Sequence, residues 1–441
     1  MTQAFVRYMR SFTGFSRDAR LFLVTTIVYG AVISLYWADF NLYVGAIGLS
    51  PSTMGGLMSV SMLAGVLVAL PCGALSDRVG RRAVMIGGMA LVAIAMLAVL
   101  PGNVALLFVG VAALGAGSQA VNVVQIPFIA EHTRPDQRNE YFAIWSAINN
   151  MTAVVAMLAG GAIATVLATG LGLGGGPAPY RVLLVGIALF GVLSVVTVLP
   201  LTSDRPGLDH PRRAQGHRFG ITVSNRGLFV RLLLPGFITA LGAGQLIPFL
   251  NVFIQKKFNL GLPEINAVIA IAYLGTTAAI IAQPALARRF GRIGSIVLVQ
   301  ASSIPFLLVL GFSPVLWTVI VALAVRNSMM NAGSPIFDAF AMEHVSAAER
   351  ATLAAGMTLL WSLGETVAPL YYGELQSRLG FTAGYAVDFI TIIVLYTIAT
   401  SLLWRWFRGS DRVAREAAAA AGGAEIEPVL VETPVTLLEH A

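Results

Sequence analysis

The sequence predicts an all-α membrane protein with twelve transmembrane helices arranged as two six-helix repeats. Three observations lead to this prediction: the composition, the number of long apolar segments, and matches between the two halves of the chain. Of the 441 residues, 57% are hydrophobic and 11% are charged, whereas soluble domains carry about 25% charged residues. Such a chain cannot fold in water without exposing large apolar surfaces, so a lipid bilayer is its expected surroundings.

Twelve apolar segments are long enough to cross a bilayer, which takes about 20 residues per helix. They lie near residues 21–45, 53–75, 83–101, 104–129, 140–168, 180–200, 227–254, 265–286, 294–312, 315–341, 351–375 and 382–406. The longest polar interruption falls in the middle of the chain. The expected organisation is a basic amphipathic segment, an N-terminal half, a cytoplasmic linker, a C-terminal half and a disordered tail, at residues 1–20, 21–200, 201–226, 227–408 and 409–441.

The placement of arginine and lysine predicts the orientation of these spans. With the N-terminus inside, 23 of the 28 basic residues fall in inner segments, as the positive-inside rule requires. The sequence therefore predicts a multi-pass protein of the cell (inner) membrane with both termini in the cytoplasm. In this orientation Glu374 and Asp388 are expected at the outer surface.

Three short matches relate the two halves of the chain. They are Glu131–Arg138 with Glu343–Arg350, Gly73–Arg81 (weakly) with Pro284–Arg292, and Phe40–Val44 with Leu250–Ile254. The offsets are 212, 211 and 210 residues. Nearly equal offsets indicate that one unit of about this length was duplicated, which predicts two parallel six-helix repeats.

A compact charged loop lies between the second and third apolar segments. Residues 73–82 read Gly-Ala-Leu-Ser-Asp-Arg-Val-Gly-Arg-Arg, so the pattern G-x-x-x-D-R/K-x-G-R/K-R/K is filled by Gly73, Asp77, Arg78, Gly80, Arg81 and Arg82. The plain alternative is that these arginines only fix the loop on the inner side. The spacing of glycine, aspartate and paired arginine is more specific than that, and it resembles the loop of major facilitator superfamily transporters.

The resemblance covers about residues 20–408. It implies alternating access, with the substrate bound between the two halves near the bilayer midplane. It also implies that the loop forms inner salt bridges, with Asp77 meeting the inner end of the eleventh helix and the arginines meeting Glu131. Through the repeat, Glu343 takes the same role opposite Arg288, Arg289 or Arg292. Because Arg288 stands where the first half has Asp77, an asymmetric inner gate is expected.

Two ionisable residues lie deep inside predicted spans, where charge is costly and therefore suggests function. At about 1.5 Å per residue, Arg326 is about 15 Å into the tenth span and Glu365 about 18–20 Å into the eleventh. Both are near the middle of a core about 30 Å thick. Two interpretations remain open. Either the two residues form a structural ion pair, or they are functional, with Arg326 holding an anionic substrate group or Glu365 carrying a coupling proton.

Further polar residues form stripes on several spans. One polar residue per span usually bonds a neighbouring helix, whereas aligned stripes favour a wet cavity. Asp39 lies about 27 Å along its span, which favours an outer gate or cap position over a central site. The candidate substrate or proton residues are Arg326, Glu365, Asn327, Asn331, Gln119, Asn122, Asn149 and Asp39, with Gln125, Asn150, Gln245 and Asn251 as further stripe members.

The motifs of enzymes and metal sites are absent from the sequence. There is no GxxxxGK[ST] or HExxH pattern, and all five histidines fall in predicted loops or tails. The sequence therefore predicts no enzyme, cofactor or metal. It predicts a secondary active transporter of a small organic solute, coupled to protons. The alternatives are a facilitative uniporter with a structural Arg326–Glu365 pair and a non-transporting sensor or scaffold.

The expected partners are a small-molecule substrate, protons and the lipid bilayer, and the expected state is a monomer. Nucleic acid is not expected, because the basic residues lie in short loops beside apolar spans. The signatures of drug/proton antiporters and of sugar porters are missing, so the sequence assigns neither a subfamily nor a direction of transport.

Overall fold

The computed structural model describes residues 14–134, 137–170, 172, 176–202, 223–272, 274, 292–332, 334–346 and 349–409. These residues form helices and short connections, without a strand among them, and the all-α prediction is confirmed. Nine described stretches are long and apolar enough to cross a membrane, and two shorter apolar helices span Leu262–Ala272 and Leu316–Met330. One of the nine, Thr352–Phe407, contains two predicted spans. The described helices are therefore consistent with twelve spans.

The described part of the N-terminal half contains six helices. They are α2 (Arg17–Ala46), α3 (Pro51–Val79), α4 (Arg81–Val99), α5 (Val104–His132), α6 (Arg138–Gly170) and α7 (Ala178–Val198). Side chains of Ser16, Ser50 and Asn103 accept backbone hydrogen bonds in the first turns of α2, α3 and α5, and such caps fix where a helix begins. Gly80 separates α3 from α4 with a φ of 94°, which favours glycine.

The C-terminal half is built from more broken helices. They are α8 (Arg226–Leu246), η1 (Ile247–Phe249), α9 (Leu250–Phe258), the helix Leu262–Ala272, α11 (Arg292–Phe312), α12 (Leu316–Ala332), α13 (Ser334–Glu343) and α14 (Arg350–Phe407). The break predicted between the eleventh and twelfth spans is reduced to one residue of α14. Gly380 has φ 73° and ψ −174°, values that let the chain turn without a polar loop.

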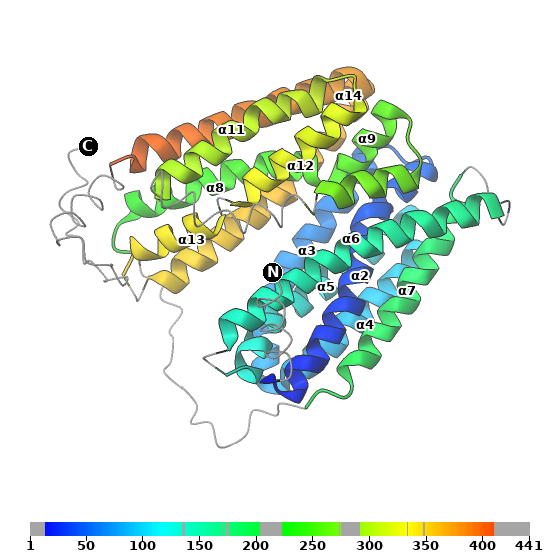
Figure 1. Ribbon diagram of the computed structural model, residues 1–441, viewed down its shortest axis with the longest axis horizontal. Coiled ribbons are helices and arrows are strands. Elements are labelled where there is room, and N and C mark those ends of the chain that lie inside the picture. Colours follow the sequence, from blue (N-terminus) through cyan, green and yellow to red (C-terminus); the bar gives the residue numbers. More distant parts are fainter. Residues whose placement is uncertain are drawn as a thin grey trace, which may run out of the picture.

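The helix ends define two ends of the molecule. The motif end holds Gly80, Thr133, Thr202 and Glu349, and the distal end holds Ser50, Gly102, Asn259 and Gly380. Figure 1 shows the two halves close together where the end of α2 approaches α9. They are apart at the opposite end, where the end of α5 and α13 lie. The halves therefore meet at the distal end and are apart at the motif end.

Small residues allow α3 and α14 to touch at the distal end. A Cβ at Gly55 would overlap the carbonyl oxygen of Pro369, and a Cβ at Gly373 would lie 2.7 Å from the carbonyl oxygen of Pro51. Glycines commonly permit such close backbone approach between membrane helices. The contact joins the N-terminal half to the C-terminal half and closes this end of the bundle.

The duplicated segments have the same local structure. His132 Nδ1 lies 2.8 Å from the carbonyl oxygen of Phe128, and His344 Nδ1 lies 2.8 Å from that of Phe340. In both pairs the ring centres are 4.0 Å apart. Equivalent contacts at equivalent positions agree with two structural repeats.

Candidate functional site

A cavity of about 2140 Å³ lies between the two halves. Helices α2, α3, α5 and α6 line it from the first half, and α8, α9, α12 and α14 line it from the second. The lining runs from Phe22 and Thr352 near the motif end to Ala38 and Leu250 near the distal end. Among the described residues, the hydrogen bonds between the halves lie at the distal limit of the cavity and beyond it, so the cavity opens toward the motif end. Pockets for drug-sized ligands have about 300–1,000 Å³, so this space includes an entrance as well as a site.

Most of the polar residues selected from the sequence line this cavity. They are Gln119, Asn122, Gln125, Asn149, Asn150, Asn251, Arg326, Asn327 and Glu365. Gln245 is instead buried and donates to the Leu241 carbonyl within α8. Asp39 lies beyond the cavity, and the side chain of Asn331 falls outside the described residues.

Arg326 and Glu365 share the cavity wall but do not form an ion pair with each other. The guanidinium of Arg326 donates to the Tyr396 hydroxyl at 2.9 Å and to Asn327 Oδ1 at 3.2 Å. It also lies 5.7 Å from the centre of the Tyr396 ring, within reach of a cation–π contact. These partners are neutral, so they orient the positive charge of Arg326 beside the cavity without cancelling it.

Two aromatic residues of the wall are absent from the sequence-based candidates. The Tyr29 hydroxyl and the Trp145 indole nitrogen are buried and have no hydrogen-bond partner among the described residues. Buried polar atoms normally have partners, so a bound solute is a natural partner for these two. Tyr29 lies in the middle of α2, away from the interfacial aromatic belts, and this position is a usable sequence signal. Trp145 carries no comparable signal.

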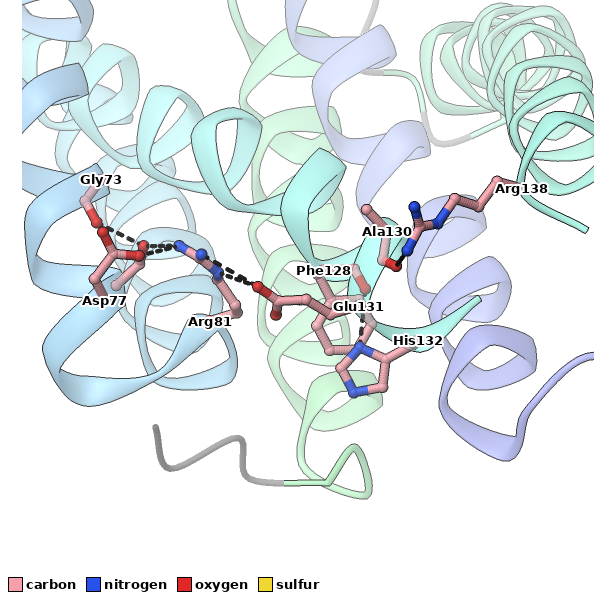
Figure 2. Close-up of polar contacts among 9 residues, drawn as sticks. Gly73, Asp77, Arg81, Phe128, Ala130, Glu131, His132 and Arg138 are labelled. Atoms are coloured by element: carbon pink, nitrogen blue, oxygen red, sulfur yellow. Dashed lines mark hydrogen bonds and ion pairs between the residues drawn. The ribbon is translucent and has the colours of Figure 1, made fainter. Parts of the chain in front are cut away.

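The loop motif forms a connected set of bonds at the motif end, as Figure 2 shows. Arg81 pairs with Asp77 at 2.8 Å and with Glu131 of α5 at 3.2 Å. The Ser76 hydroxyl donates to the Gly73 carbonyl at 2.7 Å and accepts a bond from Arg81. Arg81 therefore ties the end of α3 and the start of α4 to the end of α5.

The other motif residues have different surroundings. Arg82 donates to the carbonyl of Leu199 after α7, and Arg78 is exposed. The Asp77 side chain is 68% exposed and bonds Arg81, without a described contact to the start of α14. The separation of the halves at this end explains why the contact expected for Asp77 is not made in this arrangement.

The second half offers only a partial comparison. Residues 275–291, which include Arg288 and Arg289, lie outside the described part of the chain, as does the side chain of Arg292. Glu343 is described and exposed. The expected pairing of Glu343 with these arginines therefore stays a prediction.

Glu349 is an acid at this end that the sequence did not single out. Its carboxylate accepts bonds from the Ser224 amide and hydroxyl, both at 2.6 Å, and from the Ser346 hydroxyl at 2.7 Å. These bonds favour the charged form and hold the pKa of Glu349 down to about 2. Glu349 thus anchors the end of the linker to the start of α14.

Hydrogen bonds between the two halves, among the described residues, all lie at the distal end. Asn41 Nδ2 donates to the Pro248 carbonyl, and Asn251 Nδ2 donates to the Ala38 carbonyl at 2.6 Å. The two donors, Asn41 and Asn251, are 210 positions apart in the sequence, and so are the two acceptors, Ala38 and Pro248. The internal repeat therefore relates the two bonds. The remaining two join the Ser52 amide to Ser377 Oγ at 3.0 Å and Asn266 Nδ2 to Asp39 Oδ1 at 3.2 Å.

The expectation that Asp388 lies at the outer surface is wrong. Its residue is 0% exposed, and both carboxylate oxygens lack a partner among the described residues. The turn at Gly380 starts the last span at once, so Asp388 is about 12 Å into the bundle at 1.5 Å per residue. Glu374, by contrast, is exposed and pairs with Arg378.

Helices that can span a membrane and a polar cavity between two related halves define a polytopic transport protein. The chain matches the Major Facilitator Superfamily model over residues 22–369 and belongs to that family. It is therefore a multi-pass membrane transporter of small molecules and not an enzyme.

Several solved transporters have the same fold. The nucleoside transporter NupG is 13% identical with a TM-score of 0.69, over 88% of this chain and 99% of that one. A bacterial homologue of the human lysosomal transporter Spinster, inward-facing and occupied, is 17% identical with a TM-score of 0.69, over 88% and 97%. A D-xylose-proton symporter is 14% identical with a TM-score of 0.65, over 88% and 96%. At these identities the likeness shows the fold alone. No curated protein matches the chain in sequence.

Proposed function

We propose that this protein is a secondary active transporter that moves a small organic solute by alternating access, coupled to protons. The observation that carries the proposal is the cavity of about 2140 Å³ between the halves, with polar side chains on its wall and one closed end. A transporter needs a central site that opens to one side at a time. A sensor or scaffold has no need of polar side chains at this depth.

The distribution of arginine and lysine supports a motif end on the cytoplasmic side. The protein would then lie in the cell (inner) membrane with both termini in the cytoplasm. The cavity then faces inward, as in the Spinster homologue whose structure is described as inward-facing. In this orientation we assign the loop motif and Glu131 to the inner gate of the first half, and we retain Glu343 with Arg288 or Arg292 as its second-half counterpart. The distal contacts form the closed outer gate.

The wall of the cavity favours a solute with an anionic or strongly accepting group. Within the described part of the chain, Arg326 presents a positive charge without a paired acid, while Tyr29 and Trp145 present unpaired donors. Glu365 is the candidate carrier of the coupling proton, since a lone carboxyl at this depth is stabilised by protonation. The uniporter alternative depended on a structural Arg326–Glu365 pair, and the separate bonding of Arg326 to Tyr396 and Asn327 weakens it.

The substrate class is tested by thermal stabilisation of the purified protein against panels of anionic and neutral solutes. A ligand that binds only the folded state raises its apparent stability. We expect stabilisation by anionic solutes, and its loss in Arg326→Gln. Arg181→Gln is the matched control, because Arg181 lies outside the cavity lining. If these solutes stabilise Arg326→Gln and the unmodified protein equally, Arg326 does not contribute to substrate binding.

The coupling is tested in proteoliposomes with an imposed pH gradient and the solute that stabilises best. We expect the unmodified protein to concentrate the solute, and Glu365→Gln to exchange it without concentrating it. Glu374→Gln, on the exposed part of the same helix, should behave as the unmodified protein does. If Glu365→Gln still concentrates the solute with an unchanged pH dependence, Glu365 does not carry the coupling proton. Equilibration without concentration by the unmodified protein supports the uniporter, and no flux of any bound solute supports the sensor.

A further inference from the structure

Asp39 lies at the contact between the halves, beyond the end of the cavity. It is 2% exposed, and Asn266 of the opposite half is 0% exposed. Asn266 Nδ2 donates to Asp39 Oδ1 at 3.2 Å. A Cβ at Gly160 of α6 would lie 3.7 Å from Asp39 Oδ2 and 3.8 Å from Asn266 Nδ2. The absence of a side chain at Gly160 thus lets α6 cover the pair and keep water from it.

Two atoms of this pair have no hydrogen-bond partner among the residues that the structure describes. They are Asp39 Oδ2 and Asn266 Oδ1, both buried. When Asp39 is charged, both atoms are acceptors, so they cannot form a hydrogen bond with each other. A proton on Asp39 Oδ2 makes that oxygen a donor, and Asn266 Oδ1 is an acceptor on the amide that already bonds Asp39. The neutral acid and the amide can then exchange two hydrogen bonds, one in each direction.

No counter-ion neutralises Asp39 among the described residues. Around this end, α7 carries Tyr180 and Arg181, α9 carries Lys256 and Lys257, and the helix Leu262–Ala272 carries Glu264, while the nearby part of α6 is glycine. Tyr180 lies close enough to Asp39 for electrostatic interaction. The Lys257 ammonium donates to the Leu310 and Gly311 carbonyls, at 3.1 and 2.7 Å. A charged, unpaired carboxylate in a buried contact is costly, and protonation removes the cost.

We propose that Asp39 and Asn266 form a proton-dependent latch on the outer gate, which closes with Asp39 as a neutral acid paired to the Asn266 amide. The latch adds a proton site to the one assigned to Glu365, and this role in coupling rests on the proposed function. Closure forms one O–H bond on Asp39 with a proton taken from water at the distal side, and opening returns that proton to water. The closed state therefore binds one more proton than the open state.

The sign of the pH dependence follows from this proton count. A state that binds the extra proton is favoured at low pH and loses its advantage as pH rises. The outer gate is therefore closed in acid and opens toward alkaline pH. If a cation held the charged Asp39 in the closed gate, the pH dependence would be the opposite, with closure favoured at alkaline pH.

The latch is tested by distances across the outer gate, without any substrate. Spin labels are placed at Val104→Cys and Val315→Cys, which are exposed in the two halves at the distal end, in a Cys72→Ser background. In lipid nanodiscs, we expect the short distance to dominate at about pH 5 and a longer distance to grow toward about pH 9, a range wide enough to titrate a shifted carboxyl. Asp39→Asn, which keeps the shape and mimics the neutral acid, should show the short distance throughout.

Two further variants make the test specific. Asn266→Leu removes the partner of the acid and should move the midpoint to lower pH by on the order of one unit, the equivalent of one hydrogen bond. Glu374→Gln should keep the normal response, because Glu374 is exposed at the same end of the molecule and pairs with Arg378. A normal pH response in Asp39→Asn, or in Asn266→Leu if the first variant does not fold, overturns the latch. Because no transport is measured, a pH-insensitive gate in a protein that still uses a pH gradient refutes the latch and leaves the proposed function intact.

Discussion

At the scale of residues, Glu349 shows how one side chain can fix the junction between the linker and a long helix. Its pKa of about 2 lies below the ordinary value of 4.5, because Ser224 and Ser346 donate to the charged form. A lowered pKa contributes stability that is present above the ordinary value and is lost as pH falls toward the folded value. Glu349→Gln should therefore have a lower Tm than the unmodified protein at neutral pH.

The measurement is the Tm of both proteins in the same detergent as a function of pH. The difference should narrow as pH falls below 4.5. Glu374→Gln serves as control, since its exposed ion pair with Arg378 should contribute little. A difference for Glu349→Gln that stays constant from neutral to acid pH contradicts the assigned bonds.

At the scale of elements, the contact between α3 and α14 should decide whether the outer gate can close. A leucine at Gly55 cannot fit against the Pro369 carbonyl, so Gly55→Leu should shift the protein toward the open gate. Overpacking typically costs about 1–3 kcal/mol, which corresponds to a shift of about 5- to 150-fold in the closed-to-open ratio. The distance between the Val104 and Val315 labels reports this shift.

The matched control for this substitution is Gly87→Leu in α4, where an added Cβ meets no atom within 4 Å. It should leave the distance distribution unchanged. An unchanged distribution in Gly55→Leu itself shows that the α3–α14 contact does not limit closure.

At the scale of the whole molecule, the internal repeat should make the two asparagine bonds of the outer gate equivalent. Asn41→Ala and Asn251→Ala each remove one bond between the halves. Interhelical hydrogen bonds in membranes are worth about 0.6 to 1.7 kcal/mol, so each variant should lower the closed-to-open ratio about 3- to 20-fold.

The same label pair measures both asparagine variants, and their effects should agree within experimental error. Ser377→Ala, which removes the bond to the Ser52 amide without touching the repeat-related pair, is the comparison. A large effect of one asparagine with none of the other contradicts a symmetric gate.

Much of the whole-molecule organisation was predictable, because it depends on patterns along the chain. Apolar length gave the spans, and the repeat offsets gave the two related halves. The loop motif led to the family, and Arg326 and Glu365 were found because charge is rare in apolar segments. Both residues do line the cavity.

The tertiary structure alone decided which residues meet. Asp388 was misplaced because the turn at Gly380 leaves no polar loop to mark the end of a span. The partner of Arg326 is Tyr396, from a helix 70 positions away, and no sequence spacing indicates that contact. Tyr29 and Trp145 were recognisable as candidates only when their polar atoms proved to be unpaired at a cavity wall.

The sequence by itself determined the class, the family and the two-repeat architecture, since hydrophobic length and a local motif are one-dimensional properties. The structure decided that the motif end is open, that the distal end is closed, and that Asp39 faces Asn266 of the other half. These facts depend on how two helical bundles pack against each other. A transporter has more than one such packing, and one sequence encodes all of them.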